Sequence, residues 1–194
     1  LFEVTRAYRG IPFRLDDHFR RMKRSARRFG LRFPQRAAWV ERRIRELCRI
    51  NQLESAHVRI TLTGGGDLIL RTRPLAPLPR KWYSDGARVL LAGWKRDVSA
   101  PLYGHKTLNY LENVLTRERS RRLGAVDTIF TGLQDELLEG SVTNIFIARG
   151  GQLHTPLIRG VLPGVTRKVV LELARSERIK VIERTVYAAE LYKA

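Results

Sequence analysis

Three short segments, in a fixed order along the chain, contain the residues that could do chemistry. Lys106 lies in the first, HKTLNYL at 105–111, and Glu139 lies in the second, LEGSVTNIF at 138–146. The third, LPGVTR at 162–167, predicts the start of a helix after Gly164. They supply an amine, a carboxylate and backbone N–H groups that bind anions. Each signal is weak alone, because most lysines and glutamates are solvated surface charges.

Together, these groups are the ones that an enzyme using pyridoxal 5'-phosphate needs. The amine forms a Schiff base with the cofactor aldehyde, the carboxylate pairs with the pyridinium nitrogen, and the N–H groups hold the phosphate. A glycine turn precedes Lys106 and apolar residues follow it, so partial burial would lower the proton affinity of its amine. The polar side chains at 141–144 are candidate hydrogen-bond partners for the Glu139 carboxylate.

The composition is typical of a soluble, globular protein. The 194 residues are 43% hydrophobic and 29% charged, and no apolar run is long enough to cross a membrane. Cys48 is the only cysteine, which excludes an internal disulfide and favours a reducing, cytoplasmic location. The four histidines are scattered along the chain, so we expect no metal site.

The net charge of +18 would permit nucleic-acid binding, since arginine and lysine contacts to phosphates dominate such affinity. However, the arginines lie where predicted helices need a polar face. In residues 18–29, Phe19, Met22, Ala26 and Phe29 recur at helical spacing and charges fill the other positions. We therefore favour a solvated surface and expect neither nucleic acid nor membrane as a partner. A basic nucleic-acid-binding module is a distant alternative.

The periodicity predicts alternating strands and helices that position these residues. In the first half we expect a strand at 2–8, a helix capped by Asp16 or Asp17 and ended by Gly30, a helix at 37–50, and a hairpin at 58–70. In the second half we expect a strand at 87–94, a helix at 108–123 supported by its leucines, strands at 126–131, 142–148 and 179–186, and a helix after Gly164.

A proline-rich stretch suggests where one domain ends. Pro74, Pro77 and Pro79 mark a linker, and the texture of the sequence changes again after Pro101. We expect two domains, at 1–98 and 99–194.

With these motifs in this order, the chain resembles the class IV aminotransferases, which are fold-type IV pyridoxal phosphate enzymes, from residue 2 to residue 194. That family contains branched-chain aminotransferases, D-amino-acid transaminases, (R)-selective amine transaminases and aminodeoxychorismate lyase. The resemblance implies an α/β fold with a small N-terminal domain, a larger C-terminal domain and the cofactor at their interface. It also implies a homodimer, and relatives that extend beyond both ends of this chain.

The resemblance implies a role for each cofactor-binding residue. Lys106 is the Schiff-base lysine and the acid and base of the proton shift, and Glu139 keeps the ring nitrogen protonated. Arg21, in HFRRM at 18–22, is the phosphate-binding arginine. The cofactor-binding set is completed by Val165 and Thr166, which form the phosphate cup, and by Tyr110, which lies near the cofactor with a spacing from the lysine one residue shorter than in branched-chain enzymes.

The substrate side is predicted from the first strand and the hairpin. The segment FEVTR at 2–6, which contains Phe2 and Val4, resembles the D-amino-acid transaminase segment in having valine at its third position, and Arg6 or Arg59 could bind the substrate carboxylate. A glycine, Gly64, stands where D-transaminases carry the arginine that holds this carboxylate. For Arg6 and Arg59, a solvated strand position is an equally good interpretation.

The resemblance implies a transaminase of the D-amino-acid or branched-chain type. Its mechanism is ping-pong: an amino acid gives its amino group to the cofactor, and a 2-oxo acid then receives it. The alternative is aminodeoxychorismate lyase, which makes p-aminobenzoate and pyruvate. Val4 disfavours the lyase, which has a threonine there that assists the elimination.

Overall fold

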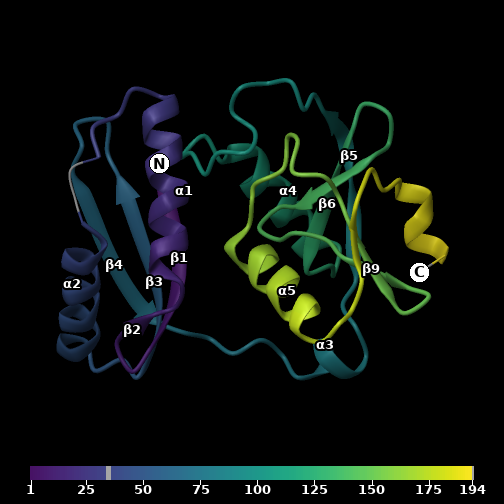
Figure 1. Ribbon diagram of the computed structural model, residues 1–194. Coiled ribbons are helices and arrows are strands. Elements are labelled where there is room, and N and C mark those ends of the chain that lie inside the picture. Colours follow the sequence, from purple (N-terminus) through teal and green to yellow (C-terminus); the bar gives the residue numbers. More distant parts are fainter. Residues whose placement is uncertain (34–35, 194) are drawn as a thin grey trace. The chain divides into compact units, whose positions relative to one another are not determined.

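The chain folds into two compact units (Figure 1). The structure is a computed structural model that describes residues 1–33 and 36–193. Unit 1 contains Leu1–Leu78 and Lys106–Leu108, and unit 2 contains Pro79–His105 and the chain from Asn109 on. The boundary is earlier than the expected one between 98 and 99, because β5 (Val89–Arg96) pairs with β6 (Asp127–Gly132) and so belongs to unit 2.

Unit 1 is an antiparallel sheet with two helices. The strand order is β2-β1-β3-β4, and the predicted hairpin is confirmed as β3 paired with β4. Its elements are β1 (Phe2–Tyr8), β2 (Ile11–Pro12), α1 (Leu15–Arg28), α2 (Ala37–Ile50), β3 (Ser55–Leu62) and β4 (Leu68–Pro74). Alternate residues of β3 are fully buried, so this strand has one face toward a core and one face away from it.

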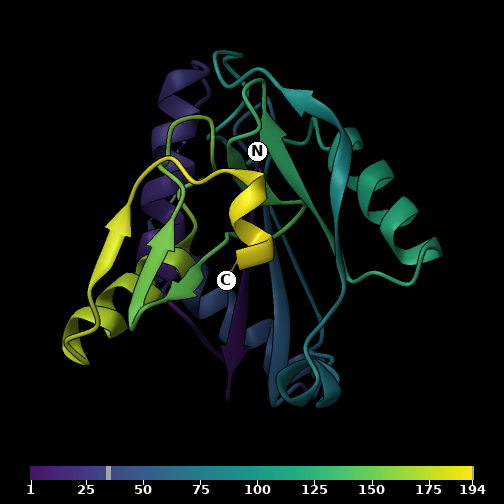
Figure 2. The same cartoon turned by 90° about the vertical axis from the view of Figure 1, so that its right-hand side faces the viewer.

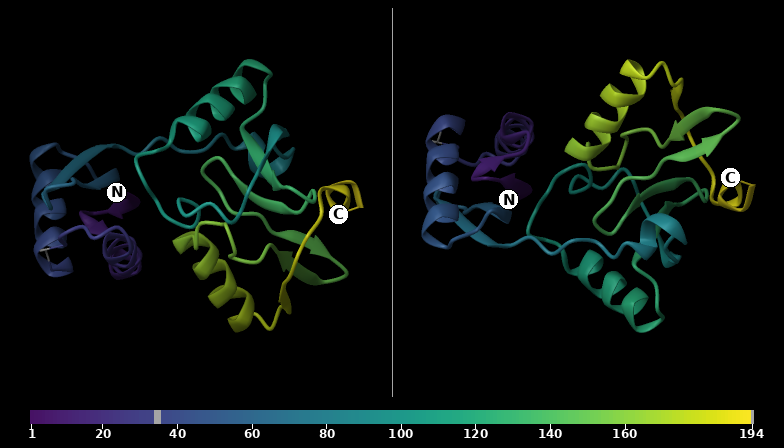
Figure 3. Two further views of the ribbon diagram at one scale, coloured as in Figure 1. Left: turned by 90° about the horizontal axis from the view of Figure 1, so that it is seen from above. Right: turned by 90° about the horizontal axis from the view of Figure 1, so that it is seen from below.

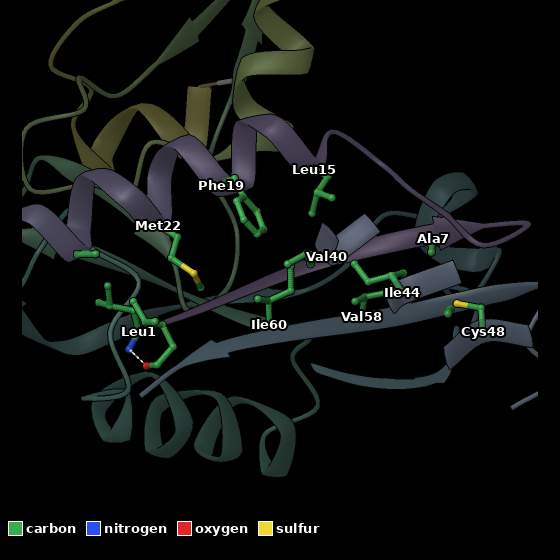
Figure 4. Close-up of a cluster of buried hydrophobic side chains, with 13 residues drawn as sticks. Leu1, Ala7, Leu15, Phe19, Met22, Val40, Ile44, Cys48, Val58 and Ile60 are labelled. Atoms are coloured by element: carbon green, nitrogen blue, oxygen red, sulfur yellow. Dashed lines mark hydrogen bonds between the residues drawn. The ribbon is translucent and has the colours of Figure 1, made fainter. Parts of the chain in front are cut away.

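Both helices pack on the same face of this sheet. Val58 and Ile60 of β3 join Phe19 of α1 and Val40 and Ile44 of α2 in one cluster of buried side chains, which Figure 4 shows in close-up. The apolar spacing predicted for α1 therefore marks its buried side. Neither of these two helices covers the opposite face of the sheet.

The start of α1 differs from the expected one. The N-cap residue is Arg14, in the left-handed region with φ 53°, and no side chain caps the helix. Asp16 and Asp17 lie in the first turn instead, where their negative charges interact favourably with the positive end of the helix dipole. Gly30 has φ +64° and follows the end of the helix, as predicted.

Unit 2 contains two three-stranded sheets, ordered β5-β6-β7 and β10-β9-β8. Its other elements are α3 (Lys81–Ser84), α4 (Leu111–Arg122), β7 (Leu137–Gly140), β8 (Ile147–Arg149), β9 (Gln152–Thr155), α5 (Val165–Ser176), β10 (Val181–Glu183) and the 3₁₀ helix η1 (Ala188–Lys193). Figure 2 shows β8, β9 and β10 side by side, and Figure 3 shows α4 and α5 on opposite sides of the strands of this unit.

Two predicted strands are much shorter than expected. The segment 142–148 pairs only at its end, where β8 (Ile147–Arg149) begins, because Ser141 and Thr143 bond to the Asp127 side chain and leave the ladder. Only Val181–Glu183 of the segment 179–186 pairs, because the Ile179 N–H closes the last turn of α5 on the Ala174 carbonyl.

Helix α4 exists, but its leucines do not form its buried face. Leu111 and Leu115 are 65% and 57% exposed. Thr116 and Ser120 are the buried residues of this helix, and the Ser120 hydroxyl bonds to that of Thr128 on β6. Small polar side chains therefore hold α4 against β6. None of the helices in the described part of the chain is long and apolar enough to cross a membrane.

Replacing Ile44 by alanine should destabilise unit 1 by about 2–5 kcal/mol, because it leaves a cavity where the side chain is fully buried. The matched control is Ile50→Ala in the same helix, since Ile50 is 59% exposed. Urea unfolding of both variants measures the difference. Equal losses of stability would contradict the packing described for α2.

Candidate active site

Lys106 lies against the first strand of unit 1. It follows Gly104, whose φ of +80° makes the predicted turn, and its carbonyl accepts the Phe2 N–H at 3.0 Å. The half-buried Lys106 side chain has its Nζ 4.7 Å from the centroid of the Phe2 ring. The backbone bond and the ring contact fix the amine beside the start of β1.

The predicted substrate residues share one face of the sheet. Phe2, Val4 and Arg6 alternate along β1 and therefore point to the side away from the core, and Arg59 of β3 is paired directly with Val4. The Arg59 guanidinium lies 4.0 Å from the centroid of the Phe2 ring, which Lys106 also contacts. The structure therefore brings these four residues to the face that Lys106 occupies.

Three further cationic or titratable residues on this face were not predicted. Arg71 is paired with Arg59, and His57 stands between Arg6 and Arg73. Burial, and then the charge of Arg73, lower the pKa of His57. Like charges directly opposite in a sheet are destabilising. The cations of this face therefore lie close enough together to repel one another.

Arg21 lies on the core side of unit 1, paired with Glu3. Its Nε and Nη2 donate to the Glu3 carboxylate at 2.8 and 2.5 Å, and His18 Nδ1 lies 2.7 Å from the same group. Burial opposes ionisation of Glu3, but the hydrogen bonds from Arg21 and His18 prevail and lower its pKa. Glu3 thus orients the guanidinium of Arg21. This partner of Arg21 was not predicted from the sequence.

Glu139 stands on β7 in unit 2, with its side chain 12% exposed. Its Oε2 accepts the Leu162 N–H at 2.9 Å, and its Oε1 lies 3.4 Å from Arg96 Nη1. Both partners come from segments far away in the sequence. The carboxylate is ordered, as expected, but by groups that the sequence analysis did not single out.

The polar residues after Glu139 bond to a different carboxylate. Asp127, at the start of β6, accepts the N–H of Ser141 at 3.1 Å and the Thr143 hydroxyl at 2.8 Å, and also the Ser141 hydroxyl. A Cβ on Gly140 would collide with the Thr143 hydroxyl, so glycine is required there. Asp127 therefore holds the turn that follows Glu139.

The start of α5 is tied to the same region. Gly164 is the N-cap, without a side-chain cap, and Val165 is buried while Thr166 is exposed. Asn144 Nδ2 donates to the Leu162 carbonyl at 3.1 Å. The Leu162 residue is thus held at its N–H by Glu139 and at its carbonyl by Asn144.

Tyr110 is the residue before α4, and its hydroxyl donates to the Ser141 carbonyl at 2.8 Å. Burial, with the nearby charges of Glu139 and Asp127, raises the pKa of Tyr110 to about 12. The phenol therefore stays protonated at neutral pH and remains a hydrogen-bond donor. The described residues contain no cluster of side chains that could hold a metal ion.

This two-unit α/β architecture is that of the fold-type IV aminotransferases. A solved structure provisionally named 4-amino-4-deoxychorismate lyase matches it with a TM-score of 0.85 and 34% identity, over 96% of this chain and 74% of that one. The sequence profile of the family "amino-transferase class IV" matches residues 1–194, and the chain belongs to this family.

Relatives of different specificity match the chain. A protein of Methanocaldococcus jannaschii, provisionally named a branched-chain-amino-acid aminotransferase, is 33% identical over all of this chain and 72% of its own length. The D-alanine aminotransferase of Bacillus licheniformis is 27% identical, with the same two coverages, 100% and 72%. The chain is therefore an enzyme of the aminotransferase class IV family, and this family uses pyridoxal phosphate.

Replacing Glu3 by glutamine should destabilise unit 1 by about 3–5 kcal/mol at pH 7, because it leaves the buried Arg21 charge without its carboxylate. The folded-state pKa of Glu3 lies below its ordinary value of 4.5, so this stabilisation is complete above that pH and disappears as pH falls through the lowered pKa. The difference in unfolding free energy between Glu3→Gln and the wild-type protein should therefore become smaller as the pH falls through this lowered pKa.

Urea unfolding at several pH values measures this gap. Glu41→Gln is the control, since Glu41 pairs with Arg45 at 2.7 Å on the surface and such pairs contribute about 0–1 kcal/mol. A gap for Glu3→Gln that does not change with pH would contradict the role of the ionised carboxylate.

Proposed function

We propose that this protein is a pyridoxal 5'-phosphate-dependent transaminase of the D-amino-acid or branched-chain type. One observation carries the proposal: Leu162 is bound at its N–H by Glu139 and at its carbonyl by Asn144, just before the start of α5. A carboxylate and a helix N-terminus are thereby kept at a fixed separation. A rigid ligand with a basic ring nitrogen and a phosphate requires that arrangement.

The chemistry of these groups fits the cofactor. Glu139 offers a carboxylate for the ring nitrogen, and the N–H groups at the start of α5 lack a side-chain cap and so can bind phosphate oxygens. Val165 and Thr166 begin this helix, and the exposed Thr166 hydroxyl can add a donor. Arg21, oriented by Glu3, would be the cationic phosphate ligand.

When bound, the cofactor supplies an electron sink for the carbanion at the substrate Cα. Lys106 Nζ would hold the cofactor, be released by the amino donor, and then carry the proton away from Cα. Glu139 would keep the ring nitrogen protonated. Tyr110 would stay neutral near the cofactor, because its raised pKa keeps the hydroxyl proton in place, and that proton is donated to the Ser141 carbonyl.

We propose that the substrate lies on the open face of the unit 1 sheet. Phe2 and Val4 offer apolar surface next to Lys106, and Arg59 is a cation near it, since both contact the Phe2 ring. Arg6 lies one row further along the same face. A carboxylate on the substrate would compensate the like charges of this face, which supports an amino acid and a 2-oxo acid as substrates.

The lyase is the second candidate, favoured by the 34% identity to the structure provisionally named 4-amino-4-deoxychorismate lyase. Val4 has no hydroxyl to assist the elimination, and this disfavours it. Release of p-aminobenzoate from 4-amino-4-deoxychorismate, without a 2-oxo acid acceptor, would identify the lyase. Conversion of an amino acid only when a 2-oxo acid is present would identify the transaminase.

We also propose that the protein is a cytoplasmic homodimer. The exposed apolar residues Leu111, Val114 and Leu115 on α4 support an interface, because such side chains are normally covered when they gather on one helix. Cys48 is buried as a free thiol, which suits a reducing compartment.

Replacing Lys106 by alanine should abolish covalent attachment of the cofactor, because it removes the side-chain amine that lies 4.7 Å from the centroid of the Phe2 ring. The wild-type protein, reduced with borohydride in the presence of pyridoxal phosphate, should yield a labelled peptide containing Lys106 by mass spectrometry. Lys95→Ala, which removes an exposed lysine paired with Asp135, is the control and should keep the label. Specific labelling that survives in Lys106→Ala would sink the assignment.

A further inference from the structure

Arg96 is a buried cation in unit 2 to which the sequence analysis assigned no role. It lies at the end of β5, and its side chain is 2% exposed. Its guanidinium carbon lies 3.3 Å from the centroid of the Phe130 ring and 5.0 Å from that of Tyr103. These aromatic contacts fix the guanidinium in a dry site, where its charge acts strongly on its neighbours.

Two carboxylates share this one cation, and they share it unequally. Glu112 Oε2 accepts from Arg96 Nη2 at 2.8 Å and from Nε at 3.0 Å. Glu139 Oε1 lies 3.4 Å from Nη1, at the limit of a hydrogen bond. One positive charge cannot neutralise two carboxylates, so the closer Glu112 takes the larger share.

Glu112 is itself held in place. Its second oxygen, Oε1, accepts the indole N–H of Trp94 at 2.7 Å. Trp94 and Arg96 lie two residues apart on β5, and Glu112 lies in the first turn of α4. Each Glu112 oxygen thus has a fixed donor, and the carboxylate cannot turn away from Arg96 without losing one of them.

We propose that Glu112 and Arg96 are positioning residues for Glu139. Arg96 holds Glu139 in one orientation, while Glu112 takes up most of the Arg96 charge, so that Glu139 keeps enough negative charge to bind a protonated ring nitrogen. This inference rests on the role of Glu139 in the proposed function. Glu112, a half-buried residue on α4, would then affect the cofactor through Arg96 and Glu139 without contacting it.

The charges of Arg96 and Glu112 have opposite effects on Glu139. Without Arg96, the two carboxylates would repel each other in a poorly solvated site, and the pKa of Glu139 would rise. Without the Glu112 charge, Arg96 would pair with Glu139 alone and weaken it as an acceptor. Tyr110 and Asp127 also face this region from the start of α4 and from β6, and the first of these stays neutral at working pH.

Glu112→Gln tests the proposal, because it removes the charge with almost no change of shape. Glu118→Gln is the matched control on the same helix, since Glu118 pairs only with Arg121 and Arg122 at the surface, at 3.7 and 3.4 Å. The first readout is the titration of the Glu139 carboxylate by ¹³C NMR in the cofactor-free, full-length protein, with Glu139→Gln used to assign the signal.

We expect the Glu139 titration midpoint to fall by about 1 pH unit in Glu112→Gln and to rise in Arg96→Gln. It should stay unchanged in Glu118→Gln. If Glu112→Gln does not fold, Glu112→Asp decides instead: it keeps the charge and should keep the wild-type midpoint, whereas a midpoint shifted as in Arg96→Gln would overturn the proposal. An identical midpoint in Glu112→Gln and Glu118→Gln would also overturn it.

The second readout uses the protein loaded with pyridoxal phosphate. The pH midpoint of its visible absorbance band should move upward in Glu112→Gln, because a ring nitrogen that loses its proton no longer repels the proton on Lys106 Nζ. The kcat should fall by about tenfold, as expected for weaker stabilisation of the reacting state, with KM within about twofold. An unshifted band with unchanged kcat would overturn the link to the cofactor.

The two failures are distinguishable. If wild-type protein forms no visible band with pyridoxal phosphate, the proposed function fails, and with it the link from Glu112 to the cofactor. The NMR titration still decides whether the two carboxylates share Arg96.

Discussion

The position of the start of α5 depends on how Leu162 is held. Its N–H is bound by Glu139 of β7 and its carbonyl by Asn144 of the following loop, so the chain enters α5 at a fixed position. A Cβ on Gly164 would collide with the Asn144 side-chain oxygen, which shows how closely the two segments approach. The carboxylate proposed for the ring nitrogen and the N–H groups proposed for the phosphate therefore belong to one hydrogen-bonded frame, and neither can shift alone.

In unit 1, the residues that stabilise the core and the residues proposed to contact the substrate alternate along the same strand, on its two opposite faces. Along β1, Glu3 points into the core and holds Arg21, while its neighbours Phe2 and Val4 point to the face that Lys106 contacts. A one-residue slip of this strand would exchange the two sets and destroy both functions. The buried pair of Glu3 and Arg21 thus fixes the register on which the open face depends.

Much of the fold follows from local patterns. The alternation at 58–62, the glycine turn and the second strand predict the hairpin, and the apolar spacing of Phe19, Met22 and Ala26 predicts the buried side of α1. The partners of the polar groups could not be predicted in this way, because they depend on which segments meet after folding. Asp127 accepts the hydroxyl groups of Ser141 and Thr143, and these bonds also shorten the strand expected at 142–148. Arg96 is one arginine in a chain with a net charge of +18, and its burial, which only the folded structure shows, is what marks it.

The most direct test of this account is an absorbance spectrum of the full-length protein with pyridoxal phosphate, recorded before and after excess D-alanine, with L-leucine in a parallel experiment. The account predicts a visible band that forms on mixing and collapses with one of the two amino acids, which would also give the stereopreference. A band that neither amino acid changes would contradict the transaminase and favour the lyase. The absence of any band would contradict the central claim that Lys106 and Glu139 bind this cofactor.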